Sequence, residues 1–177
     1  EGSSSLILSD KKISSSRASI PSILTVGAVH SHLVKLGLRG YCSINVESSD
    51  AFDTHSFAVL IGVGATTINP YLAIDSIYQR FEKKLFGKSD FESCVLKFKK
   101  SIDNGLLKIM SKMGISVISS YRGGCNFEAV GLSRAIVSDY FPGMVSRISG
   151  IGIIGIESKI KELHKKFLEK NIYVLPI

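Results

Sequence analysis

Short apolar segments alternate with longer segments of helical periodicity along this chain of 177 residues, and this alternation constrains its fold most. Residues 6–8, 41–47 and 115–118 have the length and the apolar or alternating character of strands. The segments between them carry apolar residues three and four positions apart, as amphipathic helices do. Such an order favours parallel α/β packing with right-handed crossovers.

Cap residues and prolines mark where several of the expected helices begin. Pro21 and Pro70 stand at first-turn positions, where proline is tolerated, and Asn69 precedes Pro70 as a cap.

Three strands are few for a complete α/β domain, so we expect part of a sheet, an incomplete barrel-like layer with packed helices. We expect helical segments at 21–36, 57–61, 70–86, 90–102, 106–113, 127–130, 133–140 and 157–170.

The composition is that of a globular protein, with 45% apolar and 21% charged residues and a formal net charge of +7. The lysines alternate with apolar positions at helical spacing, without an arginine-rich or aromatic-interleaved motif. We interpret them as solvated helix faces and expect no nucleic-acid partner; RNA binding through these faces is the alternative. Residues 20–38 are the longest apolar stretch, but polar residues interrupt it, so we expect no membrane span.

The cysteines and histidines do not form a metal-binding pattern. Cys42, Cys94 and Cys125 are odd in number and widely spaced, which indicates reduced thiols in the cytoplasm and not an iron–sulfur signature. His30 and His32 lie two positions apart in a helix, so they point to different faces and cannot chelate one ion. We expect them to make polar contacts at a helix end or a domain interface.

Two acidic residues end predicted strands. Asp10 follows the first strand and Glu47 ends the second. In α/β folds ligands bind at the edge where parallel strands end. The two carboxylates could therefore act as general acid or base, or each could hold a loop.

The segment 120–124 is the best local candidate for a ligand site. Arg122 offers a fork of donors, Gly123 permits a tight turn, and Tyr121 precedes them. With a helix starting at Gly123, the segment would form a stand-alone anion- or nucleotide-binding module. The alternative is a buried arginine that pairs across a domain interface.

A GxGxxG pattern occupies residues 150–155. In dinucleotide-binding folds this pattern follows a strand and opens a helix. A helix is expected after it, but residues 146–149 are short and polar for a core strand. We therefore interpret the pattern as a glycine-rich linker.

Several stretches resemble the central domain of the glutamate synthase large subunit, in order and without large gaps, from about Leu6 to Ile153. Departures from the family's usual residues occur at Ser31, Ser56, Val63 and 124–126, and a remnant of a broken gene would show such changes. The stretches that carry the resemblance are LILSD (6–10), IPSIL (20–24), AVHSHL (28–33), 46–73, GLLKIMSKMGI (105–115), SYRG (120–123) and FEAVGL (127–132).

The resemblance implies a piece of an enzyme that makes two glutamates from glutamine and 2-oxoglutarate. In this family an amidotransferase region releases ammonia, which travels through a tunnel to an FMN-binding barrel that also holds a 3Fe–4S cluster. It implies that residues 1–153 are a central-domain segment and that 154–177 form an amphipathic helix and tail. The nucleophilic cysteine and the cofactor residues lie outside this stretch, so we expect no FMN and no cluster in this chain.

A fragment of a larger subunit is expected to expose the faces that contact its neighbours. The implied partners are the amidotransferase and FMN-binding regions of the same subunit. We expect exposed apolar surface near Leu6–Leu8 and near residues 150–155, with self-association as a consequence. Eight residues are candidate interface or ligand positions: Asp10, His30, His32, Glu47, Asn69, Tyr121, Arg122 and Gly123.

Overall fold

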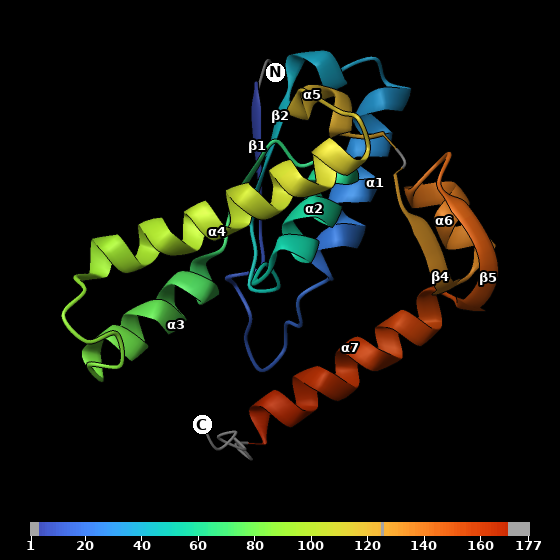
Figure 1. Cartoon of the computed structure of the whole chain (residues 1–177). Helices are drawn as coiled ribbons and strands as arrows, with labels where there is room; N and C mark the ends of the chain where they lie inside the picture. The colour runs from blue at the N-terminus through green and yellow to red at the C-terminus, as the bar shows by residue number, and fades with distance from the viewer. Residues whose placement is uncertain (1–3, 125, 170–177) are drawn as a thin grey trace.

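The computed structural model describes residues 4–124 and 126–169. It is an α/β structure with short parallel strands in two small sheets and no closed barrel, which confirms the predicted fold class. The helices surround the strands on more than one side (Figure 1). Along the chain the elements are β1 Ser5–Ser9, α1 Ser22–Lys35, η1 Arg39–Tyr41, β2 Ser43–Glu47, α2 Thr54–Gly62, β3 Thr67–Asn69, α3 Tyr71–Glu82, α4 Phe91–Lys112, α5 Ile118–Tyr121, β4 Glu128–Leu132, α6 Arg134–Tyr140, β5 Val145–Ile151 and α7 Ile153–Leu168.

The larger sheet has the order β1-β2-β3, with all neighbours parallel. The central strand β2 contributes Ile44 and Val46, at 0% and 3% exposure, to the main core. Helices α1 and α2 add residues such as Val26 and Leu60 to the same main core. The alternation along β2, which the sequence predicts, thus turns Ile44 and Val46 into the core.

The predicted third strand at 115–118 is wrong. Val117 and Ile118 are 51% and 39% exposed, and the short helix α5 begins at Ile118. The third strand is β3, which follows the turn at Gly64, a residue with φ of 129°. Three residues are too few to show a period, so this strand carries no recognisable sequence pattern.

Helices α3 and α4 form an antiparallel hairpin that extends away from the sheet (Figure 1). The expected division into helices at 90–102 and 106–113, with a break at Asn104-Gly105, is wrong, since α4 continues from Phe91 to Lys112. Gly105 contributes to packing there, because a Cβ at this position would lie 3.0 Å from the Cβ of Thr54 in α2. Gly105 therefore allows α4 to approach α2 closely and does not end α4.

A second parallel pair, β4 and β5, forms near the end of the chain with α6 as the crossover between them. The predicted helix at 127–130 and the absence of a strand at 146–149 are therefore both wrong. Polar residues obscure the alternation of β5, whose side chains are mostly exposed. α7 follows directly, and none of its described residues is fully buried.

Helix α6 connects this second pair to the main core. Its residues Ile136 and Val137, together with Phe141, are buried at 4–7% exposure in the cluster that also contains α1 and β2. Gly27 of α1 lies directly against the ring of Phe141. Ser31 of α1 donates a hydrogen bond of 3.0 Å to the carbonyl of Tyr140. The two parts of the chain thus share one hydrophobic interior.

Candidate functional site

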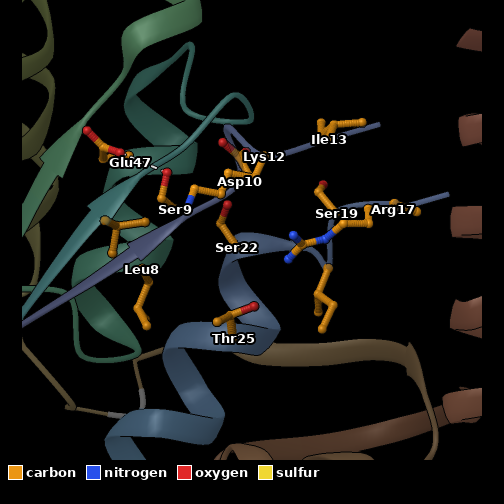
Figure 2. Close-up of a pocket in the computed structure, with 13 residues that line it drawn as sticks. Leu8, Ser9, Asp10, Lys12, Ile13, Arg17, Ser19, Ser22, Thr25 and Glu47 are labelled. Carbon is orange, nitrogen blue, oxygen red and sulfur yellow. Dashed lines mark hydrogen bonds between the residues drawn. The ribbon is translucent and has the colours of Figure 1, made fainter. Parts of the chain in front are cut away.

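The parallel strands bring Asp10, Glu47 and Asn69 to one edge of the larger sheet. The register pairs Ser9 with Glu47 and Glu47 with Asn69, and Asp10 follows Ser9 directly. A pocket of about 210 Å³ opens beside this carboxyl edge, between β1, the loop that follows it and the start of α1 (Figure 2). The expectation that the two acids share an edge is confirmed.

The Glu47 carboxylate is fully engaged by its neighbours. It accepts hydrogen bonds from Ser9 Oγ at 2.7 Å, from Lys11 Nζ at 2.9 Å and from Asn69 Nδ2 at 3.4 Å. The hydrogen bond from Lys11, followed by that from Ser9, holds the pKa of Glu47 below its usual value. Glu47 is thus an ionised link between the ends of three strands, which favours a structural role over proton transfer.

Asp10 holds the loop that follows β2. Its Oδ2 accepts from the backbone N–H of Ser49 at 2.7 Å and from Ser49 Oγ at 2.6 Å. Burial, followed by the hydrogen bond and charge of Asp10, raises the pKa of Tyr71 to about 12. A buried hydrogen bond of 2.8 Å between Ser22 and Ser48 ties the start of α1 to the same loop. The geometry at this edge therefore supports the loop-holding alternative.

A second group of polar residues lies at the opposite, amino end of the sheet, and we call His30, Arg39 and Arg122 the amino-end cluster. Arg39 donates through Nε to His30 Nδ1 at 3.0 Å, through Nη2 to the Gly64 carbonyl at 2.8 Å, and through Nη1 to the Cys42 carbonyl at 2.5 Å. The arginine thereby connects α1 with the segments that precede β2 and β3. Figure 1 shows α5, which leads to Arg122, at this end of the sheet.

The cluster contains a neutral imidazole and two cations. Burial, followed by the charges of Arg39 and Arg122, lowers the pKa of His30. Burial and the charge of Arg122 likewise lower the pKa of Arg39. A Cβ on Gly123, which has φ of 71°, would lie 3.3 Å from His30 Nε2. Glycine therefore lets the chain turn closely over the imidazole.

The remaining candidates are His32, Tyr121 and the expected helix start at Gly123. His32 is exposed and separate from His30, as their spacing predicts. Tyr121 is only 1% exposed and packs with Met110 and Phe127 in a second, smaller core. The predicted helix start at Gly123 is wrong, because α5 ends at Tyr121 and the next element is strand β4.

Arg39 is the residue of the amino-end cluster that sequence reasoning missed. Its hydrogen-bond partners lie up to 27 positions away along the chain, so no local motif identifies it. The one available signal was its place directly before the second predicted strand.

Contrary to expectation, a strand does precede the helix at the GxGxxG pattern, since Gly150 lies in β5 and Gly155 in α7. Its first glycine, Gly150, stands against the backbone of Gly131 in β4, where a Cβ would overlap the neighbouring strand. Gly152 is the N-cap residue of α7, and a Cβ on Gly155 would lie 3.0 Å from Ile151 Cβ. Two of the three glycines therefore serve packing within the chain.

The described ranges hold neither a metal-ligand group nor a membrane-spanning helix. Among residues 4–124 and 126–169, His, Cys, Asp and Glu form no group of three that could hold a metal ion. Cys42 and Cys94 are both buried and unpaired with each other. No helix in the same ranges combines the length and apolarity needed to cross a bilayer.

These features define an α/β chain with two small parallel sheets, in which Asp10 and Glu47 hold neighbouring segments and several apolar strand residues remain exposed. Residues 1–133 match the family model described as the glutamate synthase central domain. The chain belongs to the glutamate synthase central domain family.

Similar proteins extend the match over nearly the whole chain. The glutamate synthase [NADPH] large chain of Azospirillum brasilense is 55% identical over 176 residues, which are 99% of this chain and 12% of that protein. The corresponding Bacillus subtilis protein is 46% identical over 94% of this chain, and the ferredoxin-dependent glutamate synthase of Spinacia oleracea is 45% identical over 85%. The chain spans about a tenth of the length of these relatives.

Proposed function

We propose that this chain is the structural central-domain segment of a cytoplasmic glutamate synthase large subunit. In that role it joins the amidotransferase region to the FMN-binding region and helps to shape the path that ammonia takes between them. The relatives named as glutamate synthase large chains support this role, because the chain is similar to a tenth of their length.

The observation that carries the proposal is apolar surface exposed at two separate places. Ile7, on the edge strand β1, is 70% exposed. Ile148 of β5 and Ile154 of α7 are 61% and 78% exposed. Both places are those at which the sequence predicts contacts with neighbouring regions. Unpaired strand edges and exposed apolar side chains are typical of surfaces that pack against further structure.

Under this proposal the redox chemistry belongs to other regions of the subunit. The two described cysteines do not fit a cluster, since Cys42 lies in the main core and Cys94 on α4 is buried separately. The carboxylates Asp10 and Glu47 hold loops and are engaged by internal donors. We therefore propose that FMN and the 3Fe–4S cluster bind outside this chain.

A chimeric enzyme tests the proposal. The matching segment of the Azospirillum brasilense large chain is replaced by this chain, which is 55% identical to it. We expect the chimera to incorporate its cofactors and to make glutamate from glutamine without releasing free ammonia. A matched chimera with Ile148→Asp and Ile154→Asp should lose this coupling, because charges would replace apolar contacts.

Two results would contradict the proposal. A chimera that assembles and uses added ammonia, but releases ammonia from glutamine into solution, would exclude the role in the ammonia path. A chimera whose flanking regions fold and bind FMN separately, without assembling on this segment, would exclude the joining role.

A further inference from the structure

The amino-end cluster concentrates positive charge without an acidic partner. The described residues include no carboxylate that forms a salt bridge with Arg39 or Arg122. The ion pairs found among these residues involve Lys11, α7 and the β4–β5 pair. Four hydrogen bonds of Arg39 go to neutral acceptors. Half-buried cations are usually paired, because burial penalises an uncompensated charge.

The hydrogen bond from Arg39 sets the tautomer of His30. His30 Nδ1 accepts from Arg39 Nε, so the neutral imidazole carries its proton on Nε2, next to Gly123. Arg122 Nε is buried and makes none of the hydrogen bonds found in the described ranges. Arg122 therefore lies close to the imidazole, because Gly123, which follows it directly, packs against His30 Nε2. Arg39 is bonded to the other ring nitrogen of His30.

A guanidinium fork binds planar or tetrahedral oxyanions through parallel N–H donors. We propose that the amino-end cluster binds an oxyanion, namely a phosphate or carboxylate group, through Arg122 and His30. Arg39 acts as the positioning residue, since it orients the imidazole and adds its charge. This site is independent of the proposed function of the chain.

The same chemistry could come from a free anion or from a carboxylate side chain elsewhere in the subunit. The purified chain is titrated with sodium phosphate, sodium acetate or sodium chloride at equal ionic strength, and its Tm is measured. Phosphate represents a free anion and acetate a side-chain carboxylate. We expect a saturable Tm rise over chloride of about 3–5 °C at about ten times Kd, and the tighter anion indicates the source.

Arg122→Gln is the decisive variant, because the buried Nε of Arg122 has no hydrogen-bond partner among the described residues and its loss should leave the fold intact. It should weaken anion binding at least tenfold. Arg80→Gln, a change to an exposed arginine of α3, is the matched control and should bind like the parent chain.

Histidine NMR signals provide a second measurement. His30 signals should shift saturably with the anion, while those of His32, exposed on the same helix, should not. The proposal is overturned if neither phosphate nor acetate acts beyond chloride. It is equally overturned if Arg122→Gln and the parent chain respond alike, or if His30 and His32 shift together.

Discussion

Removal of the Tyr121 hydroxyl should stabilise this chain. Tyr121 is 1% exposed, and its hydroxyl oxygen is buried without a hydrogen-bond partner among the described residues. Burial raises the pKa of its phenol, as expected for a group in apolar surroundings. Its ring packs edge-on against Phe127, with 6.2 Å between centroids. Phenylalanine at this position would keep that ring contact and remove only the unpaired polar atom.

The magnitude follows from the cost of burying an unpaired hydroxyl. A buried donor without a partner costs about 1–3 kcal/mol, and replacement by an apolar group of the same shape recovers part of this. We therefore expect Tyr121→Phe to raise the free energy of unfolding by about 1 kcal/mol. For a chain of this size that corresponds to a Tm rise of about 2–4 °C.

Urea denaturation followed by circular dichroism measures the effect. Tyr121→Phe should raise the midpoint and leave the slope unchanged, since the buried surface is conserved. Tyr78→Phe is the control: Tyr78 is 50% exposed and packs against Phe91, so its change should stay within about 0.5 kcal/mol. A destabilised Tyr121→Phe variant would show that the hydroxyl is paired in solution and would refute the reasoning.

Three further predictions address the cluster, the second strand pair and the exposed surface. Since the pKa of His30 is lowered, the unfolded chain gains a proton first as pH falls below about 6.5, and stability should fall there. In chloride buffer, His30→Gln should weaken this dependence of stability on pH and His32→Gln should not. An equal pH dependence in the parent chain and both variants would contradict the prediction. Gly150→Ala should cost about 1–3 kcal/mol, measured by urea denaturation, because its Cβ overlaps the backbone of Gly131; an unchanged midpoint would exclude this contact. Analytical ultracentrifugation should show self-association that rises with concentration, and a clean monomer would count against the exposed surfaces as interfaces.

The sequence predicts elements well where a period has room to appear. The strands β1 and β2 and the helices α1, α3, α6 and α7 lie within a few residues of their expected places. The errors occur where contacts between distant parts of the chain, and not the local sequence, determine the secondary structure. β3 has three residues, and β5 is largely exposed and polar, so neither shows a strand pattern. Gly105 suggests a break to local reasoning, yet it serves as a contact between two helices.

The candidate sites were predictable to different degrees. Parallel strands necessarily place Asp10 and Glu47 at one edge, so that proximity follows from the strand assignment alone. The contact of Arg39 with His30 and its place near Arg122 depend on how three distant segments meet, which periodicity does not reveal. The role of each acid likewise depends on partners such as Ser49 and Lys11, which only the coordinates identify.

The packing of α6 has a consequence for how such proteins can be divided and recombined. The family match ends at residue 133, yet α6 lies beyond that point and supplies Ile136 and Val137 to the main core. A gene cut at residue 133 would remove these side chains and leave strand β4 without β5. The end of the family match is therefore not the end of the packed core. Exchange of this region between related enzymes should succeed only when the junction lies after the shared interior is complete.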